Sequence, residues 1–145
     1  MKIEIFALCD FARNYGGKLT MNGPFDHIVA RRVPTSHHAC SLALRIRFSK
    51  GEEGKHSFKV LYLDADGTQL MPELSGVMDV KVPPRLTSSV VDLAITIGGL
   101  PIPHYGDYAL TLTMNKDEKA TLPIQVIPPA DQSKEPGSIP PSDHE

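Results

Sequence analysis

Two neighbouring histidines and a cysteine, His37, His38 and Cys40, are residue types that could together bind a metal. Imidazole nitrogens and thiolate sulfurs are ligands that suit zinc. In an extended segment His38 and Cys40 point to the same side, as two ligands of one ion must. A third ligand would have to come from elsewhere, and the candidates are His27, His104 and Cys9. No Cys-x-x-Cys spacing supports such a set, so we predict no metal site and no cofactor, and keep His37, His38 and Cys40 as candidate ligands.

The same segment holds a local pair suited to covalent catalysis, Cys40 beside His38. A thiol becomes a strong nucleophile when a neighbouring base or a helix N-terminus lowers its pKa. The sequence shows neither a glycine-rich elbow nor a helix start at this point. A buried structural cysteine is therefore favoured, and we predict no catalytic residue.

A second candidate is the run Asp64-Ala65-Asp66-Gly67, which resembles the opening of a calcium-binding loop. The EF-hand version of that loop needs an acidic residue at its twelfth position, where this chain has Ser75. A sandwich could instead collect carboxylates from neighbouring loops, for which the candidates are Asp10 and Asp107. The Asp-Gly pair is also a strong hairpin signal, and we favour a plain hairpin turn.

Four arginines could form a small basic patch if their strands pair: Arg31, Arg32, Arg45 and Arg47. Such a patch would receive an acidic partner or a phosphate. Outward faces of strands carry arginines routinely, so ordinary solvated side chains are the competing interpretation.

The elements that must position these residues show the period-two alternation of β-strands. It is clearest over residues 40–49, where four apolar side chains are predicted to face a core: Leu42, Leu44, Ile46 and Phe48. Ala43, Arg45 and Arg47 are predicted to face solvent. Residues 58–62, 87–97 and 105–127 continue the pattern, and Gly23-Pro24 favours a bulge or a jump between sheets. The whole pattern predicts an all-β antiparallel sandwich of seven to eight strands over residues 1–127.

Composition excludes several functional classes. Fifteen Lys and Arg against 17 Asp and Glu give a net charge of -2, and residues 128–145 account for all of the excess negative charge. A nearly neutral domain lacks the basic character of nucleic-acid binders. No apolar run is long enough for a membrane span, and no secretory signal is visible. We therefore expect a cytoplasmic protein in which Cys9 and Cys40 are not joined.

The last 18 residues, 128–145, differ in character from the rest, because they contain five prolines and no aromatic residue. Such a segment buries too little apolar surface to offset its ordering entropy. We predict a flexible, proline-rich C-terminal tail.

Several short motifs together resemble a bacterial family of small proteins known as a domain of unknown function. They are Leu8-Cys9-Asp10, Gly16-Gly17-Lys18-Leu19, Gly23-Pro24-Phe25-Asp26, Cys40-Ser41-Leu42-Ala43-Leu44-Arg45 and Gly106-Asp107-Tyr108. The resemblance covers about residues 1–127 and implies an immunoglobulin-like β-sandwich and a bacterial source. It implies no catalytic residue. Tyr108 also occupies the place where such sandwiches put a corner tyrosine whose hydroxyl bonds back to the chain.

A well-specified scaffold with weak sites favours a non-enzymatic binding or protein-interaction module, with an unknown protein partner and neither nucleic acid nor membrane. Two alternatives stay open. One is a metal-binding protein or metal-dependent enzyme that uses His37, His38 and Cys40. The other is a structural subunit that forms a homodimer through its sheet edges.

Overall fold

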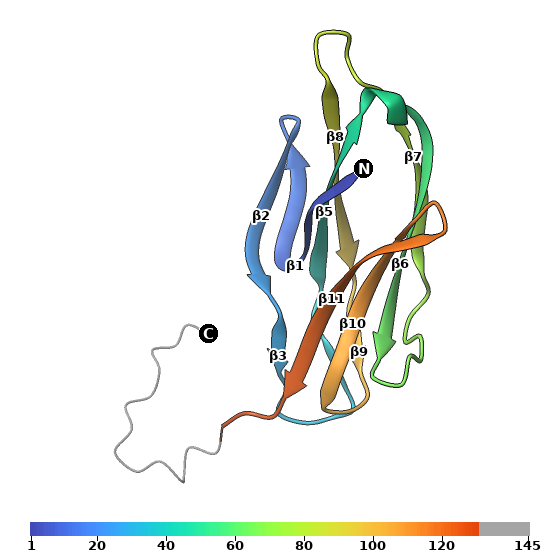
Figure 1. Cartoon of the computed structure of the whole chain (residues 1–145). Helices are drawn as coiled ribbons and strands as arrows, with labels where there is room; N and C mark the ends of the chain where they lie inside the picture. Colours follow the sequence, from blue (N-terminus) through green and yellow to red (C-terminus); the bar gives the residue numbers. More distant parts are fainter. Residues whose placement is uncertain (131–145) are drawn as a thin grey trace.

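The computed structural model describes residues 1–130, and most of them lie in β-strands (Figure 1). Two sheets pack face to face, and a small two-stranded sheet lies at one end. The four-stranded sheet has the order β2 (Lys18–Phe25), β1 (Lys2–Tyr15), β5 (Cys40–Ser49), β8 (Ser88–Ile97). The five-stranded sheet has the order β3 (His27–Val29), β11 (Asp117–Ile127), β10 (Gly106–Met114), β6 (Gly54–Asp64), β7 (Leu74–Val80). The small sheet pairs β4 (Thr35–His37) with β9 (Leu100–Ile102).

This architecture confirms the predicted all-β antiparallel sandwich and corrects its strand count. Residues 1–130 contain eleven strands rather than seven to eight. Three of them, β3, β4 and β9, have three residues each. A three-residue strand is too short to show a period-two pattern, which is why the sequence did not reveal β4 and β9. Of the predicted tail, residues 128–130 follow β11 without regular structure, and residues 131–145 lie outside the described part.

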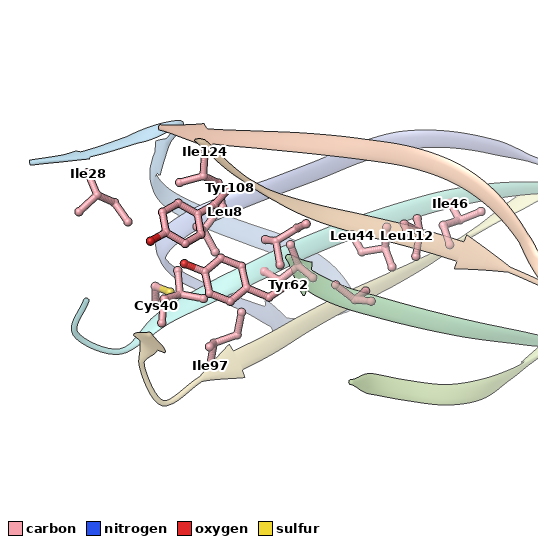
Figure 2. Close-up of a cluster of buried hydrophobic side chains, with 14 of the residues drawn as sticks. Leu8, Ile28, Cys40, Leu44, Ile46, Tyr62, Ile97, Tyr108, Leu112 and Ile124 are labelled. Atoms are coloured by element: carbon pink, nitrogen blue, oxygen red, sulfur yellow. The ribbon is translucent and has the colours of Figure 1, made fainter. Parts of the chain in front are cut away.

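The core lies between the two large sheets, as the alternation predicts. Leu42, Leu44, Ile46 and Phe48 are fully buried, and Val91, Leu93, Ile95 and Ile97 of β8 pack on the same core. From the five-stranded sheet come Val60, Tyr62, Leu110, Leu112 and Met114, all fully buried. Figure 2 shows part of this cluster, in which Tyr62 and Tyr108 lie close to Leu8 and Cys40. Burial of each such side chain contributes about 1.5–3 kcal/mol of hydrophobic stabilisation.

Strand β1 reverses direction, which adds a third layer to the molecule. Figure 1 shows β1 descending from the N terminus and then returning beside β2. We call residues 10–25 the folded-over hairpin. The side-chain amide of Asn14 donates to the carbonyl oxygen of Asp92 in β8 at 3.1 Å. That bond requires the hairpin to lie across the four-stranded sheet, because β8 is two strands away from β1 in the sheet order.

The folded-over hairpin corrects the prediction that the second face of β5 meets solvent. Ala43 is fully buried in a cluster with Cys9 and Ala12, and Leu19 and Met21 pack against it. Small side chains on the sheet let the hairpin approach closely. Alternation alone does not reveal this layer, because a small residue such as alanine is found on both solvent and packed faces.

The chain changes sheets between β2 and β3, as Gly23-Pro24 predicts. Gly23 has a positive φ of 66°, and a Cβ there would lie 2.6 Å from a carboxylate oxygen of Asp10. Glycine is therefore required at this position for both conformation and space. Within residues 1–130 the structure contains no helix with the length and apolar character of a membrane span.

Candidate binding pocket

Three tyrosine hydroxyls fix the end of the sandwich at which β3, β4 and β9 meet. Tyr108 donates to the carbonyl oxygen of His104 at 2.6 Å, which confirms the predicted corner tyrosine. Tyr62 donates to the carbonyl oxygen of Pro101 at 2.9 Å. Tyr105 donates to the carbonyl oxygen of Ala30 at 2.8 Å. These bonds attach β9 and the end of β3 to the core, so the loops between them are held in place.

A pocket of about 450 Å³ opens at this end. We call it the loop-end pocket. Its residues come from β3, β4, the connection between them, the residue after β4, and β9: Ile28, Val29, Ala30, Arg31, Arg32, Thr35, Ser36, His37, His38 and Ile102. Its volume lies in the range of ordinary small-ligand sites.

The chemistry of the loop-end pocket combines an apolar floor with a cationic rim. Ile28, Ala30 and Ile102 are buried, whereas Arg31 and Arg32 are exposed. Among residues 1–130, no carboxylate lines the pocket. Neither guanidinium makes an ion pair with any side chain of residues 1–130. The arrangement is suited to a ligand that carries both negative charge and apolar groups.

His37 forms one wall of the pocket. Its ring centroid lies 4.1 Å from that of His38 and 5.3 Å from that of Phe25. Its Nε2 atom is buried and has no hydrogen-bond partner among the described residues. Burial, helped by the charge of His38 and opposed by Asp10, lowers the pKa of His37. The ring is therefore neutral at pH 7, and one ring nitrogen remains able to accept or donate a hydrogen bond.

The structure separates the candidate metal ligands. Cys40 is buried in the core below the pocket, and burial raises the pKa of its thiol to about 11. His27 pairs with Asp26, and His104 lies 3.6 Å from a carboxylate oxygen of Asp64. Cys9 belongs to the outer cluster under the folded-over hairpin, on the face opposite Cys40. In residues 1–130 no three His, Cys, Asp or Glu side chains are grouped as metal ligands would be.

The position of Cys40 also removes the basis for the thiol–histidine pair. A thiol with a raised pKa is protonated at neutral pH and is a poor nucleophile. The two cysteines are free, and their side chains point to opposite faces of the four-stranded sheet, so geometry prevents a disulfide between them.

The candidate calcium loop is a turn. One carboxylate oxygen of Asp64 accepts the N–H groups of Asp66 and Thr68, at 2.9 Å each. These bonds, with that from Thr68 first, lower the pKa of Asp64. Gly67 has a positive φ of 81°, as a tight turn requires. The other proposed ligands lie elsewhere, because Asp10 faces Gly23 and Asp107 lies in β10.

The four candidate arginines do not gather in one patch. Arg45 and Arg47 lie on the outer face of β5, where Glu4 accepts a hydrogen bond from Arg45 at 3.1 Å and one from Arg47 at 2.6 Å. Arg45 also lies 3.6 Å from Asp92. Arg31 and Arg32 are at the loop-end pocket. Sequence reasoning missed Ser36 and Ile102 as pocket residues, and the adjacent Arg31-Arg32 pair before a turn was the one available signal.

The described residues form a small β-sandwich with a pocket at one end of its sheets. The profile of the Family of unknown function (DUF6941) matches residues 4–127, and this chain belongs to that family. Among solved structures, it is similar to the sensor domain of the anti-sigma factor RsgI4 from Pseudobacteroides cellulosolvens. That likeness has 12% identity and a TM-score of 0.39, and it covers 88% of this chain and 94% of the other. No curated protein matches the sequence.

Proposed function

We propose that this protein is a non-enzymatic binding module that recognises an anionic partner at the loop-end pocket. The observation that carries the proposal is the pair Arg31 and Arg32 above a buried apolar floor, with no carboxylate from the described part of the chain in the pocket lining. An arginine pair that no acid of residues 1–130 neutralises can form charge-assisted hydrogen bonds with a ligand. The apolar floor adds contact area for an uncharged part of that ligand.

The surroundings of the pocket support binding rather than covalent chemistry. The nearest thiol, Cys40, is buried and has a raised pKa. The tyrosine bonds to Pro101 and Ala30 hold the pocket walls before any ligand arrives. A preformed site loses less conformational entropy on binding than a flexible one.

Three finer features belong to the same proposal. We infer an immunoglobulin-like sandwich, because Tyr108 makes the corner bond that is frequent in that class. We infer a bacterial source from the family resemblance. We also infer a cytoplasmic location, with which two free thiols agree.

Titration with chemically defined probes tests the proposal. Backbone amide shifts are followed by NMR while the full chain is titrated with inorganic phosphate, citrate or an acidic peptide. We expect shifts confined to residues 28–38 for at least one probe, and loss of those shifts in the double variant Arg31→Glu/Arg32→Glu. Arg85→Glu, which reverses an exposed charge outside the pocket, is the matched control. Absence of shifts for all three probes at millimolar concentration would contradict the proposal.

A further inference from the structure

The loop-end pocket lies between two strand edges that pair with no further strand of residues 1–130. β3 is the first strand of the five-stranded sheet and pairs with β11 on one side only. β4 pairs with β9 on one side only. Residues of both strands line the pocket, including Val29 and Ser36. Free edges carry backbone N–H and C=O groups that are ready to pair with another strand.

The ladder of β3 shows which backbone groups face the pocket. Gln125 donates to the carbonyl oxygen of Asp26 at 3.1 Å, and Ala30 donates to that of Ile127 at 2.9 Å. Even-numbered residues of this segment therefore direct their backbone groups toward β11. Because backbone groups alternate in direction along a strand, the N–H and C=O of Val29 point toward the free edge.

The pairing of β4 likewise leaves the backbone groups of one residue directed toward its free edge, on the opposite side of the pocket. Ser36 lies opposite Pro101, which has no N–H to donate. The bonded pairs are therefore Thr35 with Ile102 and His37 with Leu100. The backbone N–H and C=O of Ser36 consequently point away from β9, to the side of the pocket.

From this geometry we propose that the ligand is an extended acidic protein segment, which adds as a short strand between β3 and β4. The inference rests on the proposed function and specifies its ligand class. Val29 and Ser36 would supply main-chain hydrogen bonds from the two sides, while Arg31 and Arg32 would pair with acidic side chains of the segment.

The size of the pocket fits this occupant. One residue of an added strand fills a space of about 4.8 Å by 10 Å by 3.4 Å, on the order of 160 Å³. The volume of about 450 Å³ then accommodates roughly three residues. β3 and β4 have three residues each, so the edges and the space between them match in length.

A backbone-methylated peptide provides the sharpest test. Affinity is measured by calorimetry for a blocked pentapeptide in which aspartate and valine alternate, and for the same peptide with methylated backbone nitrogens. Methylation keeps the charges and side chains but removes the main-chain donors. We expect the methylated peptide to bind at least about fivefold more weakly, since each lost hydrogen bond lowers affinity roughly two- to tenfold. A peptide in which lysine replaces aspartate should not bind.

Variants of the protein test the same main-chain hydrogen bonds by changing the protein instead of the peptide. Ser36→Pro removes the N–H that faces the pocket, and β9 does not use that N–H, so the fold should tolerate it. Ser36→Ala keeps the N–H and is the control. Binding should weaken much more in Ser36→Pro than in Ser36→Ala, because only the proline removes the N–H. Hydrogen exchange of the unmodified protein gives an independent readout, because the Val29 and Ser36 amides should become protected when the acidic peptide is bound.

The outcomes separate this inference from the proposed function. If citrate or phosphate binds at Arg31 and Arg32 as tightly as the peptide, and the Val29 and Ser36 amides stay unprotected, strand addition is wrong while anion binding stands. If the methylated and unmethylated peptides bind equally, strand addition is also wrong. If the acidic peptide, citrate and phosphate all fail to shift residues 28–38, both proposals are wrong.

Discussion

Two pairs of arginines in this protein have opposite environments. On the outer face of the four-stranded sheet, Arg45 and Arg47 share the carboxylate of Glu4, and Arg45 also approaches Asp92. At the loop end, Arg31 and Arg32 make no ion pair within residues 1–130 and border an open pocket. The first pair helps to hold strands together. The second pair is available to a ligand, so the comparison teaches that the surroundings, rather than the residue type, separate structural from binding arginines.

The largest effect is expected where the outer face is packed most tightly. Ala43→Leu adds three carbon atoms under the folded-over hairpin, where Ala43 is fully buried. Overpacking of this kind should lower the free energy of unfolding by about 1–3 kcal/mol. Urea denaturation measures the change, with Ala65→Leu in an exposed turn as the control. Equal stability of the two variants would mean that the hairpin does not cover this face.

A comparable change at the loop end is Tyr108→Phe. The variant loses the hydrogen bond to the carbonyl oxygen of His104 and leaves a partly buried acceptor without it. We expect a loss of about 1–2 kcal/mol in the free energy of unfolding. Tyr15→Phe, at an exposed tyrosine of β1, should change stability by less than about 0.5 kcal/mol. A Tyr108→Phe protein as stable as Tyr15→Phe would show that the corner bond contributes nothing.

Glu4→Gln removes the anion shared by the outer arginines and should lower the melting temperature by a few degrees at pH 7. The hydrogen bond from Arg47, followed by that from Arg45, holds the pKa of Glu4 below its usual value of 4.5. The stabilisation of the folded state by ionised Glu4 is therefore complete above pH 4.5. It is lost as the pH falls through the lower folded-state pKa. The difference in melting temperature between the unmodified protein and Glu4→Gln should shrink over that acidic range. Glu73→Gln, an exposed carboxylate outside the ion pairs, should show no such difference.

The smallest effect on stability is expected for Arg31→Ala/Arg32→Ala. These side chains are exposed and support no described ion pair, so the free energy of unfolding should change by less than about 0.5 kcal/mol. The same variant should lose binding of the acidic peptide. Thermal denaturation checks the stability and calorimetric titration checks the binding. A marked loss of stability would mean that Arg31 and Arg32 have a structural role like that of Arg45 and Arg47.

The local elements could be predicted from residue order alone. Alternating apolar residues such as Leu42, Leu44 and Ile46 define one buried face, because side chains of a strand alternate in direction. The Asp64 turn and the Tyr108 corner were also predictable, since each depends on residue types within a few positions.

Which residues share a site could be seen only in the folded chain. Cys40 lies in the core, away from His37, and Ala43 is buried under a reversed strand. Arg31 and Arg32 lie at the pocket, apart from the other two arginines. The loop-end pocket depends on β3 and β4, whose pairing partners β11 and β9 lie far away in sequence. Contacts between such distant segments follow from how the sheets pack, and a period-two pattern carries information about each strand's faces but none about its neighbours.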